Sequence, residues 1–198
     1  MDMIFQITEY VSQHTGLKPW ALSVFLVVLA AVLLDFVQRR VIRRVTDIVR
    51  KTSNLWDDAL LDAVPRPLSL VIWLVGITMA AQLIPSTVEG QLLHDDVVVK
   101  IRQVGVLGAL TWFLVVFVLN LENSIIATAR ARGRAVDQTT VKALGRVVRI
   151  TVVVTAVLVG LDTLGFNVAG LMAAGGIGGL AIGFAAKDML ANLFGGLT

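Results

Sequence analysis

Five long apolar runs constrain the fold of this chain more than any other feature of its sequence. They cover residues 19–37, 67–84, 104–121, 147–164 and 168–186. Each run is close to the ~20 helical residues that cross the hydrocarbon core of a bilayer. Because backbone in lipid must satisfy its hydrogen bonds internally, helix is the structure expected for every run. The sequence therefore predicts an all-α membrane protein with five transmembrane helices per subunit.

The composition agrees with a lipid environment. Hydrophobic residues make up 57% of the 198 residues, charged residues only 16%, and the mean hydropathy is +0.83. Soluble domains are nearer a quarter charged. The chain has no cysteine, which excludes disulfides and thiolate chemistry. His14 and His94 stand alone in polar segments, so we predict no metal, no cofactor, no catalytic residue and no enzymatic activity.

The basic residues lie in the gaps between the apolar runs, which argues against a nucleic-acid partner. Most of them fall in the link after the first run and in the link after the third. Cytoplasmic loops of membrane proteins are rich in Lys and Arg. The pattern therefore predicts that the N-terminus lies outside and the C-terminus lies in the cytoplasm.

Both basic links are predicted to contain helix. After the first run, apolar residues recur at helical spacing, so the first helix is expected to continue beyond the membrane. Its arginines and a tryptophan near the next helical segment could bind lipid head groups or could serve only as a topology signal; they are Arg39, Arg40, Arg43, Arg44 and Trp56. In the second link Asp137 is placed to cap a helix that begins near Gln138. Asp35 and Asp162 are expected to mark span ends.

The fifth run is distinguished by its small residues. Glycine costs about 1 kcal/mol relative to alanine inside a helix, so this many glycines need a physical reason. In membranes, small residues let helix backbones approach closely. Because they occur on several faces, they suit a helix flanked on both sides by copies of itself in a ring-shaped homo-oligomer. The small residues predicted to pack this helix include Gly175, Gly176, Gly178, Gly179, Ala181 and Gly183.

One face of the fifth run keeps bulky side chains. Leu180 and Phe184 are four residues apart and stack on one side of a helix. If the small faces pack sideways, these side chains point to the ring axis, where such rings form a hydrophobic constriction. The alternative is that both residues face lipid or pack against other helices.

The apolar character changes at Lys187 and Asp188. A break in the helix is expected there, followed by an amphipathic half-helix that includes Asn192 and ends near Gly196. In a ring, Lys187 and Asp188 would lie at the inner mouth of the pore. The lysine could equally extend its side chain to the membrane interface.

Residues 175–196, above all Gly-Gly-Leu-Ala-Ile-Gly-Phe-Ala-Ala-Lys-Asp-Met-Leu-Ala-Asn-Leu-Phe-Gly-Gly, resemble the pore helix of the small-conductance mechanosensitive (MscS-like) channels. The resemblance implies a homoheptamer in a bacterial inner membrane. It also implies opening by membrane tension, with release of ions and small osmolytes on hypoosmotic shock. At the positions of Leu180 and Phe184 this family has its closed constriction. Neighbouring pore helices of the family pack through small residues at the positions of Ala173, Gly176, Gly179, Ala181 and Gly183. Asn192 and Gly196 match the half-helix that follows.

The chain departs from the family pattern at two positions. Asp188 replaces a glycine at the break, so bending is expected instead at Gly178, Gly179 or Gly183, and Phe184 is bulkier than its counterparts. Family members continue into a β-rich cytoplasmic domain, so this chain is expected to be the transmembrane portion of a multi-helix member.

Three regions are predicted. Residues 1–66 form an N-terminal segment, the first span and its basic extension; residues 67–165 form the second to fourth spans; residues 166–198 form the pore helix and the start of its second half. Two other classes stay open at this point. A secondary transporter would need polar groups in mid-membrane, where the spans hold little beyond Thr78, Thr111 and Thr155. A non-conducting scaffold subunit would need only the small-residue packing.

Overall fold

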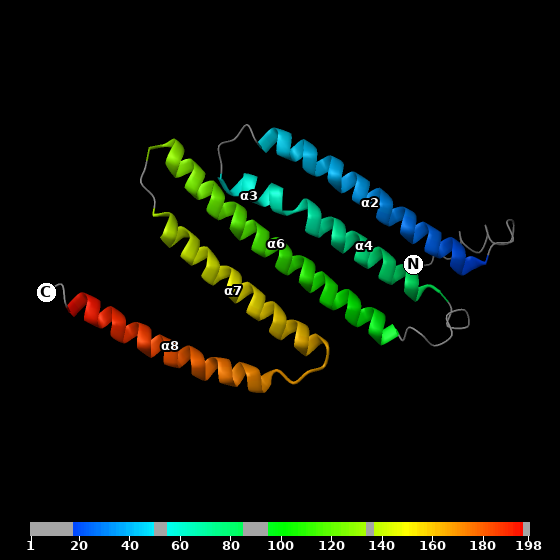
Figure 1. Ribbon diagram of the computed structural model, residues 1–198. Helices are drawn as coiled ribbons and strands as arrows, with labels where there is room; N and C mark the ends of the chain where they lie inside the picture. Colours follow the sequence, from blue (N-terminus) through cyan, green and yellow to red (C-terminus); the bar gives the residue numbers. More distant parts are fainter. Residues whose placement is uncertain (1–17, 50–54, 85–94, 134–136, 196–198) are drawn as a thin grey trace. The chain divides into compact units, whose positions relative to one another are not determined.

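The computed structural model describes residues 18–49, 55–84, 95–133 and 137–195. Every regular element in these ranges is an α-helix, which confirms the predicted all-α class (Figure 1). The chain divides into two compact units, one up to Val157 and one from Leu158. The helices are α2 (Pro19–Val49), α3 (Leu55–Ala63), α4 (Pro65–Gln82), α6 (Asp95–Ala131), α7 (Gln138–Thr163) and α8 (Ala169–Gly195).

Four stretches of helix are long and apolar enough to cross a membrane. They lie in α2, α6, α7 and α8 and cover Pro19–Thr46, Asp96–Ala131, Gln138–Thr163 and Ala169–Lys187. Four of the five predicted spans therefore meet this criterion of length and composition. The remaining helix, α4, has 18 residues, but it begins with Pro-Arg-Pro and ends with Gln82, so its apolar stretch is shorter.

The first and third predicted runs are parts of longer helices. The 31-residue α2 continues through the arginines that follow the first run, which confirms the predicted helical extension. The 37-residue α6 extends beyond the third run at both ends. At 1.5 Å per residue, both helices are longer than the ~30 Å hydrocarbon core of a bilayer, so both must protrude from it.

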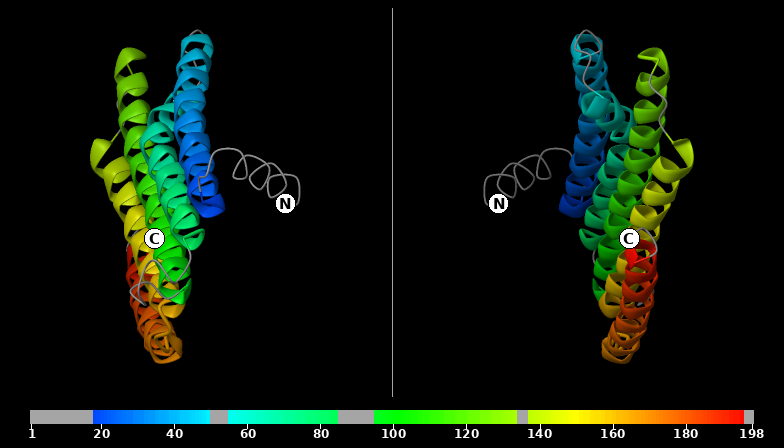
Figure 2. Two further views of the ribbon diagram at one scale, coloured as in Figure 1. Left: turned by 90° about the vertical axis from the view of Figure 1, so that its right-hand side faces the viewer. Right: turned by 90° about the vertical axis from the view of Figure 1, so that its left-hand side faces the viewer.

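Small residues hold the first unit together. Helices α2, α4 and α6 lie side by side with α4 in the middle, and α3 packs against α6 (Figures 1 and 2). Where α2 and α4 cross, a Cβ atom on Gly76 would lie 2.8 Å from the Cβ of Ala31. Where α4 meets α6, a Cβ on Gly105 would overlap the side chain of Leu74. Each crossing thus depends on one glycine that leaves room for its neighbour.

The burial pattern is the reverse of that of a soluble protein. The buried apolar side chains are mostly alanines, and they include Ala31, Ala59, Ala63, Ala80 and Ala109. Large apolar side chains point outward instead, and Phe25, Phe36 and Leu144 are each at least 60% exposed. Such a surface would drive aggregation in water. Acyl chains solvate it at little cost, and the first unit therefore fits a bilayer.

A hydrogen-bonded turn joins α7 to α8 within the second unit. The Gly165 amide donates to the Asp162 carbonyl (2.9 Å) and the Phe166 amide donates to the Leu161 carbonyl (3.0 Å). These two bonds form a Schellman motif, which needs a left-handed residue after the helix. Gly165 supplies it with φ of +94°. Two residues further on, the side chain of Asn167 accepts from the amide of Ala169 (3.0 Å) and begins α8.

Replacing Gly165 should weaken this turn. A left-handed conformation costs a residue with a side chain about 1–2 kcal/mol, so we expect Gly165→Ala to lower the thermal unfolding midpoint of the purified protein, followed by circular dichroism. Gly108→Ala is the matched control, because Gly108 is helical and a Cβ there meets open space. Equal midpoints for the two variants would contradict the assigned role of the turn.

The start of α7 is capped as predicted. One carboxylate oxygen of Asp137 accepts from the Thr139 amide (2.9 Å) and the other accepts from the Thr140 hydroxyl (2.6 Å). These two hydrogen bonds, the Thr140 bond foremost, hold the pKa of Asp137 below the ordinary value of 3.8. Because this pKa is lowered in the folded state, the stability that the cap contributes is present above pH 3.8. It is lost as the pH falls through the lowered pKa.

This assignment can be tested by titration. Followed through the NMR shift of the Thr139 amide, Asp137 should titrate with a midpoint below 3.8. Thr140→Val removes the largest contribution and should move the midpoint toward 3.8. Thr151→Val should leave it in place, because the Thr151 hydroxyl donates to the Val147 carbonyl of its own helix (3.0 Å). A midpoint unchanged in Thr140→Val would refute the hydrogen-bonding explanation.

The predicted break at Asp188 is wrong. Helix α8 runs without interruption from Ala169 to Gly195, through Lys187 and Asp188. The residues after Ala186 include Lys, Met, Leu and Ala, which favour helix, and no glycine follows Gly183 until Gly195. A single aspartate costs a helix much less than a glycine or a proline. The polarity of Lys187 and Asp188 therefore interrupts the apolar run without interrupting the helix.

Candidate functional site

Helix α8 exposes the side chains that the sequence analysis assigned to the pore. Leu180 and Phe184 are both 65% exposed, and their four-residue spacing places them on one face of the helix. A Cβ atom added to any of six α8 glycines would meet nothing within 4 Å; they are Gly170, Gly175, Gly176, Gly178, Gly179 and Gly183. Within the described part of this single chain, no neighbour explains these glycines. They contrast with Gly76 and Gly105, each of which faces a side chain of another helix.

The structure places the predicted pore residues along one continuous helix. Ala173, Ala181 and Lys187 are exposed on α8 together with the glycines. Asp188 and Asn192 lie in the same helix, but their side chains are outside the described residues, as is all of Gly196. Trp56 lies in α3 and its side chain is likewise outside them. The packing, hinge and mouth roles of these residues stay predictions.

A polar network that the sequence analysis missed joins α2 to α4. Asp35, expected only to mark a span end, is buried and forms an ion pair with Arg39 (2.8 Å). The Ser69 hydroxyl of α4 donates to the same carboxylate and accepts from Arg39 Nη2 (3.1 Å). The side-chain amide of Gln38 also donates to the Asp35 carboxylate (3.1 Å). The Arg39 side chain is therefore bound to Asp35 and Ser69, although it also stays exposed at the surface.

A second missed contact joins α6 to α7. Glu122 is buried and forms an ion pair with Arg149, whose side chain is also largely covered. The carboxylate of Glu122 lies directly over Gly145, where a Cβ atom would overlap it. The missing side chain of Gly145 thus leaves the space that the Glu122 carboxylate occupies. The signal in the sequence was faint: an acid just past the third apolar run, and a glycine and an arginine four residues apart in the next helix.

The Glu122–Arg149 ion pair is buried within helices that can span a membrane, so losing one partner would be costly. In a medium of low dielectric constant, a paired charge is tolerated and an unpaired charge is expensive. Both residues lie in stretches that can span a membrane. The pair therefore fixes how α6 meets α7 at this level, since moving the two helices apart would leave two charges without partners.

A double-mutant cycle tests this contact. Glu122→Gln and Arg149→Gln should each destabilise the protein by about 3–5 kcal/mol, because each leaves a buried charge unpaired. The double variant should lose less than the sum. Gly145→Ala should also destabilise, whereas Gly108→Ala should not. Additive effects in the cycle, measured by unfolding in mixed micelles, would show that the two charges do not interact.

The predicted lipid-binding arginines gather at one end of α2. Arg39, Arg40, Arg43 and Arg44 surround a shallow hollow of about 250 Å³, which also contacts Phe36. All four side chains are exposed.

Within the described ranges, no group of three or more His, Asp or Glu side chains could hold a metal ion. His14 and His94 lie outside the described residues.

Taken together, these observations define a class: a helical membrane protein with closely packed helices in its first unit and a glycine-rich helix, α8, whose glycines meet no neighbour within the described residues. Residues 146–187, which run from α7 to Lys187 of α8, match the family model described as mechanosensitive ion channel, transmembrane helices 2/3. The matched segment therefore belongs to the transmembrane helix region of the MscS family of mechanosensitive ion channels. This confirms the resemblance drawn from residues 175–196.

Individual relatives agree with the family assignment. The chain is 43% identical over 61 residues to the low conductance mechanosensitive channel YnaI of Escherichia coli (strain K12), which covers 31% of this chain and 18% of the relative. Two channels of Methanocaldococcus jannaschii match over longer stretches. The small-conductance channel MscMJ is 24% identical over 83% of this chain and 45% of its own length. The large-conductance channel MscMJLR is 25% identical over 98% of this chain and 53% of its own length.

The chain spans about half the length of these two archaeal relatives. No solved structure matches it significantly. The match to YnaI covers less than a third of the chain, whereas the archaeal relatives cover most of it at lower identity.

Proposed function

We propose that this chain forms the membrane part of an ion channel that opens under membrane tension and releases ions and small osmolytes on hypoosmotic shock. The observation that carries the proposal is the match of α7 and α8 to the transmembrane helices of mechanosensitive channels. The exposed faces of α8 support it, because they hold glycines that no neighbour in the described chain occupies.

In this proposal five helices cross the membrane. Helix α4 lies between α2 and α6, and both of these contain stretches that can span a bilayer. A helix held between two spans must occupy the same layer, so α4 crosses as well, despite its shorter apolar stretch. With the arginine-rich end of α2 in the cytoplasm, the N-terminus lies outside and the C-terminus inside. A bacterial inner membrane is the proposed location.

The proposed assembly is a homoheptamer with α8 around the axis. Small residues at 173, 175, 176, 179, 181 and 183 would let each α8 pack against the next copy. Leu180 and Phe184 would then form two rings that close the pore by excluding water. Gly178, Gly179 and Gly183 are the proposed bending points. Lys187 and Asp188 would lie at the inner mouth, and Asn192 and Gly196 would belong to the segment that follows.

The outer helices supply the proposed sensor. Tension favours the state with the larger area in the membrane plane, so the outer layer needs only a different area in the two states. The description of the matched family model makes α7 and α8 helices two and three, which leaves α2 and α4 additional to the minimal channel. Glu122 and Arg149 would carry movement of this layer from α6 to α7.

The structure gives little support to a transporter. The hydroxyl of Thr78 donates to the Leu74 carbonyl of its own helix (2.7 Å), and that of Thr111 donates to the Leu107 carbonyl (2.8 Å). These two mid-span groups are therefore engaged with their own backbone. A substrate site would need such groups to face a cavity instead.

Polar substitutions on α8 test the proposed gate. In excised liposome patches of the full-length protein, Leu180→Ser or Phe184→Ser should lower the pressure threshold, because a polar ring wets more easily. Ile182→Ser is the matched control: Ile182 is also exposed (72%), but it lies two residues from both Leu180 and Phe184, on the opposite side of the helix.

Two results would count against the proposal. Unchanged thresholds in both Leu180→Ser and Phe184→Ser would remove these residues from the gate. If patches that contain the assembled wild-type protein carry no current at any applied pressure, the result would favour a non-conducting scaffold subunit.

A further inference from the structure

The backbone hydrogen bonds are interrupted where α3 meets α4. A single residue, Val64, separates the two helices, and its φ of −71° and ψ of −43° are helical. The Val64 amide donates to the Leu60 carbonyl (3.1 Å), and the Leu68 amide donates to the Val64 carbonyl (3.1 Å). Among residues 55–82, no backbone hydrogen bond runs directly from α4 to α3. The two helices therefore follow each other with a gap in their bonding.

Two prolines account for most of this gap. In a continuous helix the amides of residues 65, 66 and 67 would donate to the carbonyls of residues 61, 62 and 63. Pro65 and Pro67 have no N–H to donate, and the amide of Arg66 forms no such bond. Three consecutive helical hydrogen bonds are thus missing at one place. Sharp bends in helices occur at such prolines, and bending here would break no backbone hydrogen bond.

The helices on the two sides of the gap are held by different contacts. Helix α3 packs against α6, where Ala59 and Ala63 are buried and the Asn120 amide donates to the Ala59 carbonyl (3.4 Å). Helix α4 is bound to α2 through Ser69, whose hydroxyl donates to the Asp35 carboxylate. Helix α4 also packs against α6. A tilt of α2 therefore pulls on α4 directly, whereas α3 is held mainly by α6.

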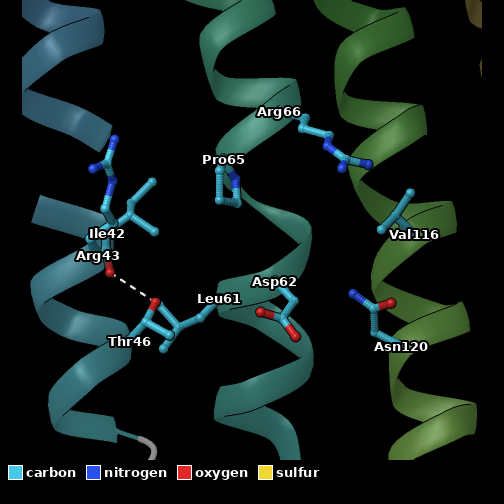
Figure 3. A pocket seen from close by; sticks show the side chains of 9 residues that line it. All are labelled: Ile42, Arg43, Thr46, Leu61, Asp62, Pro65, Arg66, Val116 and Asn120. Carbon is cyan, nitrogen blue, oxygen red and sulfur yellow. Dashed lines mark hydrogen bonds between the residues drawn. The ribbon is translucent and has the colours of Figure 1, made fainter. Parts of the chain in front are cut away.

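Two opposite charges lie on either side of the gap without a bond between them. Asp62 belongs to α3 and Arg66 to α4, and both side chains are exposed. An acid and a base four positions apart in this order attract each other on the surface of a continuous helix. In the described part of the chain, however, neither side chain takes part in an ion pair. Figure 3 shows Arg66 extending from α4 toward α6, and Asp62 on the other side of Pro65.

These charges have room to move. Asp62, Pro65 and Arg66 line a hollow of about 600 Å³ between α2, α3, α4 and α6 (Figure 3). All of its lining residues belong to the first unit. The two charged side chains can therefore change conformation without displacing a packed neighbour. The gap in the backbone bonds and the unpaired charges lie at the same place.

We propose that the gap between α3 and α4 is a hinge, and that an Asp62–Arg66 ion pair stabilises its straight position. The described structure shows the hinge with the pair open. When α3 swings into line with α4, the two side chains meet and hold the segment straight. The hinge lets α2 and α4 tilt together while α3 stays on α6. The inference goes beyond the proposed channel function and requires only the contacts of the first unit.

Distances between spin labels test the hinge in liposomes that contain the full-length protein, diluted with unlabelled protein so that each assembly carries one labelled chain. Residues 1–198 contain no cysteine of their own. Leu60→Cys with Ile77→Cys places labels on exposed positions of α3 and α4, seventeen residues apart. Val28→Cys with Val45→Cys is the matched control, because it has the same spacing on exposed positions of the uninterrupted α2.

The two label pairs should give different distance distributions. The control pair should give one narrow distribution near ~26 Å, from the rise of about 1.5 Å per helical residue. The pair across the gap should give two distances, the longer one close to that of the control and the shorter one from the bent position. A single distribution as narrow as that of the control would overturn the hinge.

Charge variants test the ion pair with the same labels. Asp62→Asn or Arg66→Gln should lower the ratio of the longer to the shorter distance about twofold, as expected for the loss of one such pair. Asp62→Arg with Arg66→Asp restores opposite charges and should recover the wild-type ratio. Arg40→Gln is the matched control, because it removes the same charge as Arg66→Gln from an exposed position that does not line the hollow. A ratio unchanged by Arg66→Gln, or changed equally by Arg40→Gln, would overturn the role of the ion pair.

Restoring the missing amides tests the cause of the bend. Pro65→Ala with Pro67→Ala supplies both N–H groups, so it should leave only the longer distance. Pro19→Ala is the control, because Pro19 is the first residue of α2, where a proline interrupts no helical bond. Two distances in the Pro65→Ala, Pro67→Ala variant would overturn the assignment of the hinge to the missing hydrogen bonds. None of these measurements uses ionic current, so failure of the hinge and failure of the channel proposal are distinguishable.

Discussion

Helices in lipid gain little by burying large apolar side chains, because acyl chains are equally apolar, so their contacts depend on close backbone approach and on a few polar groups. The first unit follows this constraint throughout. Gly76 admits Ala31, Gly105 admits Leu74, and Gly145 admits the carboxylate of Glu122. Each contact pairs a missing side chain on one helix with a filled position on the next. The large apolar residues are left on the outside, where the bilayer covers them.

The same dependence on close backbone approach explains why α8 contains so many glycines. In the first unit, glycines that are tightly covered have an identifiable neighbour in the chain. The glycines of α8 have none within the described residues, and a side chain at any of them would meet open space. A helix with this composition is expected to lose stability through its glycines unless another surface fills the space they leave. Further copies of α8 would provide that surface, which is why the family assignment and the free faces of α8 support the same assembly.

Local sequence signals predicted much of this fold, and contacts between distant residues were beyond them. The helical extension of α2, the cap at Asp137 and the helical start near Gln138 each depend on neighbours within a few positions, and all three are confirmed. The Asp35–Ser69 and Glu122–Arg149 contacts join residues 34 and 27 positions apart, and no periodicity reports such pairs. The error at Asp188 had another cause: a change in polarity was taken for a change in backbone conformation. The site residues of α8 could be selected from composition, but the described residues of the chain contain no partner for its glycines.

The turn between α7 and α8 has a mechanical consequence. Its hydrogen bonds from Gly165 and Phe166 close the end of α7, and the bond from Ala169 to Asn167 begins α8 only a few residues later. A connection of this kind has few freely rotating backbone torsions, so it can change its length or direction only slightly. A long loop would absorb a displacement of α7, whereas this short connection transmits it to the first turn of α8. The stiffness of a handful of backbone bonds thus sets how faithfully motion at the end of one helix becomes motion at the start of the next.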